Sequence, residues 1–340
     1  MGAGGPYDDD EYDDDFEDAS DDLDSDTLLP AMSEDNYEGF MDSLKVRSPH
    51  LHEIFLLRME RAGWTPAPGD RPHAGVTADI QNRMTENLGR MTLPQKAREK
   101  ALSGFHFADT DKGRRLAREA LDMDPECADA LTLLGCYEKT PGQGLMRYRA
   151  AMGIYEKQHG GPPAQCRDGD CWNDLQARPW LRAVRHVADC LLHMGNKEEA
   201  SKCFEDLLER NPSDALYAAP FLCRMLIDEN RDAEARSATD KYMTARPDFA
   251  QYTRALLEYR THGDSPQARS ALEEALSINP LISEFLVDET IPQSCLKDPA
   301  LQEPLAAAND YADICGQAWA QSPGALQWLA VQSDKDGPEM

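Results

Sequence analysis

From about residue 77 onward, the chain alternates between helical stretches, with apolar residues at three- and four-residue spacing, and short polar turns. Three consecutive segments share one scheme: an apolar helix, a polar turn, a second helix with a small residue at a fixed place, and a closing proline. They are LRAVRHVADCLLHMGNKEEASKCFEDLLERNP (181–212), LYAAPFLCRMLIDENRDAEARSATDKYMTARP (216–247) and FAQYTRALLEYRTHGDSPQARSALEEALSINP (249–280). This pattern predicts three helical hairpins in a row.

The small residue and the proline each have a physical reason. Two antiparallel helices that cross closely need a small side chain at the crossing, and each second helix carries an alanine there: Ala200, Ala235 and Ala268. Proline cannot continue a helix, so it forces the turn into the next unit. The closing prolines, Pro212, Pro247 and Pro280, are spaced 35 and 33 residues apart. We therefore expect stacked hairpins.

An earlier copy of the scheme is interrupted. LAREALDMDPECADALTLLGCYE supplies a closing helix, Pro125 and the first helix of another unit, whose second helix is GLMRYRAAMGIYEKQ (144–158). The next closing proline is Pro212, 87 residues after Pro125, so a long irregular loop is expected in between. Pro220 lies inside the first helix of the second unit, which predicts either a late helix start with Pro220 in the first turn or a kink.

The repeated segments resemble the tetratricopeptide repeat, about 34 residues of helix, turn and helix. More specifically, QARPWLRAVRHVADCLLHMGNKEEA, LLERNPSDALY, the segment 252–287 and the terminal SPGALQWL are similar to a bacterial tetratricopeptide-like family related to the central region of the animal suppression-of-tumorigenicity proteins. The resemblance implies a helical scaffold for protein contacts without established catalytic residues. This chain departs from the family in its acidic N-terminal segment, and it lacks the transmembrane segments of the animal relatives.

The expected fold is all-α, a superhelical array of antiparallel helix hairpins. The expected regions are a disordered acidic tail (1–47), a short helix (48–64), a linker (65–76), N-terminal helical repeats (77–160), an irregular insertion loop (161–177), three contiguous units (178–290), a C-terminal capping region (291–330) with one helix around 305–330, and a disordered tail (331–340).

The acidity of the chain is concentrated at its N-terminus. Residues 1–44 contain 17 Asp or Glu and no Lys or Arg, so the remainder contributes only −10 of the net charge of −27. Like-charge repulsion and few apolar groups predict disorder there. The segment is either a solubilising tail or one that docks on a basic surface of the chain or of a partner. Such acidity argues against nucleic-acid binding.

The nine cysteines are scattered and mostly embedded in apolar helical patterns, which predicts reduced, buried thiols in a cytoplasmic or nuclear compartment. No targeting peptide or apolar run long enough for a membrane span is evident. Cys166 and Cys171, with His159 and Asp168 nearby, suggest zinc, but no second close Cys or His pair completes four ligands. We expect no metal or cofactor; a regulatory disulfide between these cysteines is the other alternative.

In repeats of this class the first helix of each hairpin lines the concave groove. Counting equivalent positions, and adding the end of the insertion, predicts a groove rich in arginine and aromatic residues, namely Arg178, Arg182, Arg185, His186, Tyr217, Phe221, Arg224, Arg254 and Arg260. Such a surface suits a protein or peptide partner with acidic or aromatic residues, and the acidic N-terminus could occupy it first. The alternative is that these arginines pair with neighbouring acids and bind nothing.

No phosphate loop, G-x-S-x-G or H-E-x-x-H motif is present, so an enzyme is not expected. The preferred function is an adaptor or scaffold for protein partners. Two alternatives stay open: a self-associating structural protein, and an unrecognised enzyme with a cleft near His186, Asp189 and His193.

Overall fold

The computed structural model describes residues 48–63, 82–84, 86–108, 110–164, 166, 169–288 and 301–333. Within these residues the regular elements are helices, and no strand occurs, which confirms the all-α prediction. The chain divides into two units, residues 1–92 and 93–340. The acidic tail 1–47, the linker 65–76 and residues 334–340 lie outside the described residues.

The first unit contains helix α2 (Pro49–Arg61). Pro49 occupies the first helical position, where its missing N–H is not needed. The helix ends at Ala62 and Gly63, and Gly63 adopts φ 81°. Asn87 Nδ2 donates to the carbonyl oxygen of Arg61 over 3.1 Å and so satisfies a carbonyl at the end of α2.

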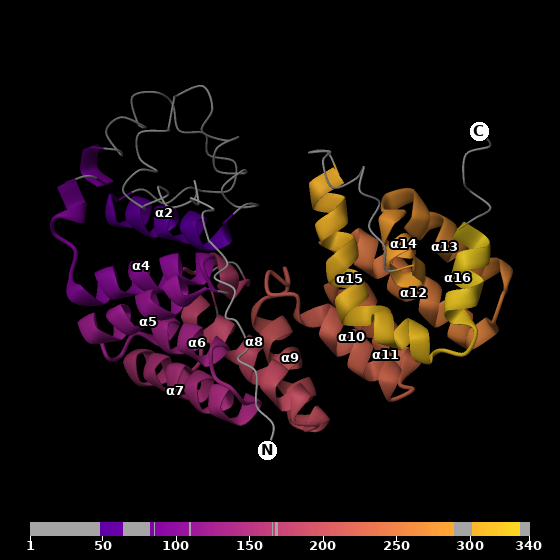
Figure 1. The fold of residues 1–340 in the computed structure, drawn as a ribbon, viewed down its shortest axis with the longest axis horizontal. Coiled ribbons are helices and arrows are strands. Elements are labelled where there is room, and N and C mark those ends of the chain that lie inside the picture. Colours follow the sequence, from indigo (N-terminus) through magenta and orange to yellow (C-terminus); the bar gives the residue numbers. More distant parts are fainter. Residues whose placement is uncertain are drawn as a thin grey trace, which may run out of the picture. The chain divides into compact units, whose positions relative to one another are not determined.

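The second unit is built from antiparallel helix pairs that follow one another along the chain (Figure 1). The pairs are α4 (Leu93–His106) with α5 (Asp111–Met123), α6 (Ala128–Cys136) with α7 (Pro141–His159), α8 (Arg178–His193) with α9 (Lys197–Arg210), α10 (Ala218–Asp228) with α11 (Asp232–Tyr242), and α12 (Pro247–His262) with α13 (Pro266–Ile278). The last three pairs coincide with the three repeats read from the sequence. The array of hairpins is therefore confirmed.

Small residues let the paired helices approach. Ala200, Ala235 and Ala268 are fully buried on α9, α11 and α13, as the repeat pattern predicts. Gly135 on α6 has the same role, because a Cβ atom there would lie 2.3 Å from the ring of Tyr148 on α7. A larger side chain at any of these positions would force the hairpin apart.

Two of the three closing prolines, Pro212 and Pro280, follow a buried asparagine that helps to form the turn. Asn211 and Asn279 are 1% and 4% exposed. Asn211 Oδ1 accepts from the Oγ of Ser213, and Asn279 Oδ1 accepts from the backbone N–H of Leu281. Each side-chain oxygen accepts from a donor just after the proline and so holds the turn, which gives the repeated Asn-Pro phrase a structural role.

Helix α10 starts late, with Pro220 in its first turn, so the first of the two alternatives for Pro220 holds. The carboxylate of Asp214 caps the helix, accepting from the backbone N–H groups of Ala218 at 2.6 Å and Ala219 at 3.0 Å. Asp214 and Tyr217 both have positive φ, 51° and 56°, within this short connection. The connection is therefore strained and held by its cap.

The segment between α7 and α8 contains the short 3-10 helix η3 (Cys171–Asn173) and a disulfide between Cys166 and Cys171. The disulfide corrects the expectation of reduced thiols at these two positions and agrees with the alternative of a disulfide between them; Cys136, expected to be buried, is exposed. Sequence spacing could not decide this pairing, because only folding brings the two thiols together. Asp170 Oδ2 accepts from the backbone N–H of Ser213, which fastens the segment to the turn after α9.

After the hairpins come α14 (Leu281–Asp288), α15 (Gln302–Gln321) and α16 (Ala325–Ser333). The one helix expected around 305–330 is thus two, and the break falls at Ser322 to Gly324, where Gly324 adopts φ 78°. Helix α15 packs against α10, α12 and α14. Tyr311 and Trp319 of α15 are fully buried in the core of these helices.

Candidate functional site

One predicted groove residue of α12, Arg260, and its neighbours Phe249 and Thr253 lie against helix α15 or its C-terminal end. The ring of Tyr311 meets Phe249 edge-on, with 5.1 Å between centroids, and its Oη lies 3.3 Å from Thr253 Oγ1. Arg260 Nη1 donates to Ser322 Oγ at 2.9 Å, at the end of α15. Side chains of α15 and of the residues at its end therefore occupy this part of the predicted groove.

Two predicted groove arginines on α8 are buried and engaged inside the fold. Arg178 Nε donates to the carbonyl oxygen of Trp172 at 2.8 Å, and its guanidinium lies 4.6 Å from the centre of the Trp172 ring. Arg182 Nη2 lies 2.6 Å from Asp129 Oδ1, while Arg98 Nε lies 3.2 Å from Asp129 Oδ2. Arg98, Asp129 and Arg182 form a buried ionic triad that joins the first helices of three hairpins, α4, α6 and α8.

Two other predicted residues, Arg185 of α8 and Phe221 of α10, come together beside the α9–α10 connection that carries Tyr217. Arg185 Nε donates to the carbonyl oxygen of Leu216 at 2.9 Å, and its guanidinium lies 4.2 Å from the centre of the Phe221 ring. The same guanidinium forms an ion pair with Asp189. The charge of Arg185 is thus held over an aromatic face next to the α9–α10 connection.

A fourth residue completes this cluster. The guanidinium of Arg246 lies 4.7 Å from the centre of the Tyr217 ring and 4.1 Å from that of Phe249. Arg246 is in the turn before α12, outside the first helices, so counting groove positions missed it. We call Arg185, Tyr217, Phe221 and Arg246 the junction surface.

Asp214 lies in the electrostatic field of this surface. Burial raises the pKa of its carboxyl group to about 6, although the backbone N–H groups of Ala218 and Ala219 and the charges of Arg185 and Arg246 favour the ionised form. The ionised carboxylate of Asp214 therefore both caps α10 and interacts with the charges of Arg185 and Arg246.

The remaining predicted arginines are paired with acids. Arg224 Nε lies 3.5 Å from Asp228, Arg260 Nε 2.9 Å from Asp232, and Arg254 Nη2 2.8 Å from Asp240. These three contacts agree with the alternative stated from the sequence, in which the groove arginines pair with neighbouring acids. Arg254 does not join the junction surface but lines a separate hollow.

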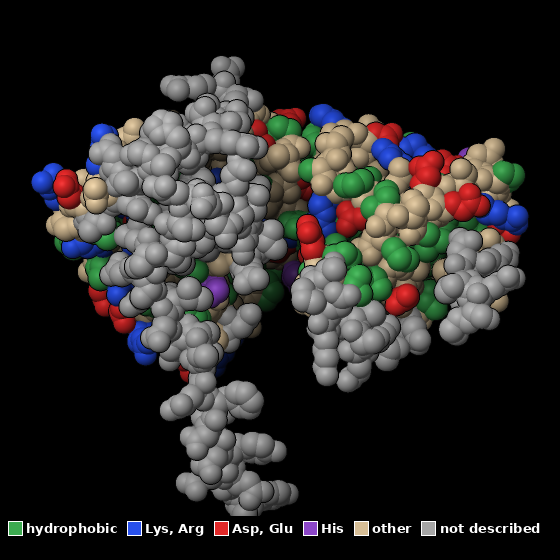
Figure 2. Space-filling view, turned by 90° about the horizontal axis from the view of Figure 1, so that it is seen from above, with side chains coloured by type: hydrophobic (Ala, Val, Ile, Leu, Met, Phe, Trp, Pro, Cys, Tyr) green, Lys and Arg blue, Asp and Glu red, His purple; other side chains and the backbone are tan. Residues whose placement is uncertain are grey.

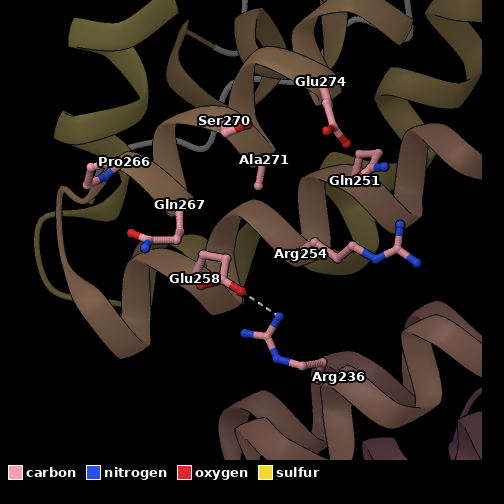
Figure 3. A pocket seen from close by; sticks show the side chains of 9 residues that line it. All are labelled: Arg236, Gln251, Arg254, Glu258, Pro266, Gln267, Ser270, Ala271 and Glu274. Atoms are coloured by element: carbon pink, nitrogen blue, oxygen red, sulfur yellow. Dashed lines mark hydrogen bonds and ion pairs between the residues drawn. The ribbon is translucent and has the colours of Figure 1, made fainter.

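That hollow is lined by residues of α11, α12 and α13 (Figure 3). It is open, has a volume of about 470 Å³, and we call it the hairpin hollow. Arg236 and Glu258 form an ion pair of 2.7 Å at one end. Most of the residues that line it have polar side chains; the lining consists of Arg236, Gln251, Arg254, Glu258, Pro266, Gln267, Ser270, Ala271 and Glu274.

His186, Asp189 and His193 each make a different contact. The ring of His186 stacks on Tyr148 at 4.9 Å, and burial lowers its pKa to about 4, so it is neutral near pH 7. The carboxylate of Asp189 pairs with Arg185, and Nδ1 of exposed His193 contacts the Asp189 carbonyl oxygen at 2.8 Å. In the described ranges, no group of three His, Cys, Asp or Glu residues could hold a metal ion.

The surface charge of the C-terminal helices is mixed. On the face shown in Figure 2, acidic and basic side chains alternate over these helices, with small hydrophobic areas between them. A partner on this face would meet local ion pairs and donors rather than a broad field of one sign. Among the described helices, none is both long and apolar enough to cross a membrane.

The fold and these surfaces define a helical-repeat protein of the tetratricopeptide type. The sequence profile of the tetratricopeptide repeat matches residues 186–214, which cover the C-terminal half of α8 and all of α9. Repeats of this kind generally form binding surfaces for other proteins, and the fold is typically non-enzymatic.

Within this class, the chain is similar in sequence to the ST7 proteins. It is 28% identical over 237 residues to "Protein ST7 homolog" of Drosophila pseudoobscura pseudoobscura, covering 63% of this chain and 44% of that protein. It is 25% identical over 262 residues to "Protein ST7 homolog" of Caenorhabditis elegans, covering 66% and 48%. The chain therefore spans about half the length of the curated relatives it matches.

Proposed function

We propose that this chain is a protein-binding scaffold and that a partner segment with acidic and aromatic residues docks on the junction surface. The observation that carries the proposal is the conformation of Tyr217. Its backbone is left-handed, with φ 56°, and its side chain is 38% exposed beneath the guanidinium of Arg246. Such a conformation costs a non-glycine residue on the order of 1 kcal/mol, and strained residues gather at ligand-binding sites.

The chemistry of the surface supports an acidic and aromatic ligand. Arg246 donates from Nε to Asp248 over a long 3.4 Å, and its Nη atoms have no hydrogen-bond partner within the described part of the chain. These atoms can bind a carboxylate in a bidentate manner. The exposed edge of Tyr217 and the partly buried ring of Phe221 supply aromatic contact area.

The chain's own N-terminal sequence has this composition. YDDDEYDDDF, residues 7–16, places three aromatic residues among acids. We propose that residues 1–44 compete with the partner for the junction surface, so that a partner must displace them.

The experiment is a fluorescence-anisotropy titration of a labelled peptide of residues 5–18 against a chain that lacks residues 1–44. We expect Arg246→Glu and Tyr217→Gly each to raise the Kd at least about tenfold, equivalent to about 1.4 kcal/mol. Thermal melting establishes that both variants remain folded.

Arg269→Glu is the matched charge reversal, because Arg269 pairs with Asp264 at the surface of α13 and does not line the junction surface. It should leave the Kd unchanged. If Arg269→Glu weakens binding as much as Arg246→Glu, the peptide senses only overall charge and the proposed site is wrong.

A further inference from the structure

The hairpin hollow carries unused hydrogen-bonding groups. Gln251, Gln267, Ser270 and Glu274 line it, and their side chains have no hydrogen-bond or ion-pair partner within the residues that the structure describes. Polar side chains on one helix surface are ordinarily solvated. Here, however, side chains from two helices converge on a single concavity.

The two guanidinium groups at the hollow also have N–H donors that their ion pairs do not use. Arg254 binds Asp240 Oδ1 through Nε and Nη2, which leaves Nη1. Arg236 binds Glu258 through Nη1, which leaves Nε and Nη2. Because a guanidinium has five N–H donors and cannot lose its charge at neutral pH, both groups can still bind a carboxylate oxygen.

The arrangement of the lining is polar at both ends and small in the middle. Figure 3 shows Glu274 and Gln251 toward one end, Arg236 and Glu258 at the other, and Ala271 between them. A side chain as small as Ala271 lets a ligand's main chain come close. The volume of about 470 Å³ lies toward the lower part of the range for small-ligand sites and suits a few residues of a chain.

These features match a polypeptide backbone better than an apolar helix. An amide side chain both donates and accepts, and so does a peptide group, so Gln251 and Gln267 can pair with the main chain of an extended segment. No large apolar side chain is among the residues that line the hollow. An amphipathic helix would find no large apolar side chain there against which to pack its apolar face.

We propose that the hairpin hollow binds an extended segment of a partner protein, with a carboxylate side chain at Arg236 and Arg254 and a basic side chain at Glu274. This site is separate from the junction surface and rests on different residues. It gives the scaffold a second docking point with its own sequence preference.

The test is selection of a displayed library of random heptapeptides on the full chain, with counter-selection on Ser270→Trp, which fills the hollow. We expect enriched peptides to carry an acidic and a basic residue at a fixed spacing. For a labelled consensus peptide, Arg254→Glu should raise the Kd at least tenfold. Replacing the peptide's acidic residue with lysine should restore binding to that variant, which a merely structural effect could not do.

Two controls separate this site from the rest of the chain. Arg269→Glu, a charge reversal on α13 outside the hollow, and Tyr217→Gly, in the junction surface, should both leave the consensus peptide's Kd unchanged. If peptide binding to the junction surface is disproved with Tyr217→Gly, binding to the hairpin hollow can still be observed. If the hollow binds no peptide, the junction surface can still bind its own.

Ser270 is exposed, so the tryptophan should be tolerated; Gln267→Trp replaces it if melting shows loss of fold. The proposal is overturned if no peptide distinguishes the wild-type chain from the filled variant. It is equally overturned if the consensus peptide binds Arg254→Glu as tightly as the wild type.

Discussion

The hairpins α4 to α9 and the hairpins α10 to α13 follow one repeat scheme but complete it differently. In the first group, the first helices are tied by the buried ionic triad of Arg98, Asp129 and Arg182. In the second, they are covered by α15, through contacts such as that of Tyr311 with Phe249. The repeat pattern thus determines which residues of each first helix face inward. It does not determine whether these residues pack against a neighbouring hairpin or against a covering helix.

The two solutions differ in their energetics. Covering a face with a helix removes apolar area from water, which contributes about 25 cal/mol per Å². Burying charges costs desolvation, and the attraction of the ions roughly offsets it only while all partners are present. The C-terminal group should therefore be sensitive to lost packing, and the N-terminal group to a lost partner charge.

The largest expected effect comes from emptying the covered face. Trp319 of α15 is fully buried, and its Nε1 donates to Tyr311 Oη at 3.2 Å. Trp319→Ala should lower the free energy of unfolding by about 3–5 kcal/mol, because it leaves a cavity and removes one of the two hydrogen-bond partners of the Tyr311 hydroxyl. Urea unfolding followed by far-UV circular dichroism measures this.

Gln317→Ala, at an exposed position of the same helix, is the matched control and should change the free energy by less than about 0.5 kcal/mol. Hydrogen exchange then locates the damage. We expect faster exchange in α10 and α12 than in α4 and α6. Equal acceleration in both groups would mean that the two groups open as one cooperative unit, and the contrast between them would fail.

The second effect comes from breaking the ionic triad. Arg182→Ala leaves the carboxylate of Asp129, which is 1% exposed, with Arg98 alone, and should lower the free energy of unfolding by about 3 kcal/mol. Arg254→Ala removes an exposed pair with Asp240 and should lower it by less than about 1 kcal/mol. The same urea titrations compare the two arginines.

Both arginines were predicted for one groove, so this comparison tests which of them is structural. If Arg182→Ala and Arg254→Ala lowered the free energy of unfolding by similar amounts, burial of the triad would not make its loss more destabilising than the loss of an exposed ion pair. Faster exchange confined to α4, α6 and α8 after Arg182→Ala would support the assignment of the triad to the N-terminal group.

The hairpins were predictable from the sequence because their determinants are local. Ala200 and Pro212 lie within one unit, and the need for a small residue or a helix stop acts over a few residues. The triad was not predictable, because Asp129 and Arg182 are 53 positions apart and belong to different hairpins. Neither residue type nor spacing along the chain identifies such a pair.

The candidate site was predictable only in part for the same reason. Counting positions found Tyr217 as well as Arg185 and Phe221, of which the last two do meet, but it assumed an open groove and a regular turn. Arg246 was missed because it sits in a turn. The cover over Thr253 was missed because α15 follows the repeats and has no repeat pattern of its own, although its alternation of buried and exposed residues, with Tyr311 and Trp319 inside, marks it as a packed helix.

The smallest expected effect concerns pH and again separates the two groups. His186, at a predicted groove position of α8, has its pKa lowered to about 4 by burial, with smaller contributions from Arg185 and Arg182. As the pH falls below about 6.5, the unfolded chain binds a proton that the folded chain refuses. Stability from this residue is therefore complete above that pH and is lost as the pH falls toward about 4.

Asp214 acts in the opposite direction. Burial raises its pKa to about 6, so the folded chain takes up a proton before the unfolded chain does, and the free energy of unfolding gains as the pH falls from about 6 to about 4. The wild-type curve contains both contributions and can look flat. Only the difference between two proteins isolates the histidine.

We therefore expect His186→Gln to become more stable relative to the wild type by about 1–2 kcal/mol between pH 7.5 and pH 5, measured by urea unfolding at each pH. Parallel curves for the two proteins would mean that His186 titrates normally and is not held against Tyr148. The predicted groove positions of α10 and α12 hold no histidine. At low pH we therefore expect hydrogen exchange to become faster in α6 and α8 of the wild type, where the ionic triad rather than a covering helix joins the hairpins. His186→Gln should suppress this acceleration.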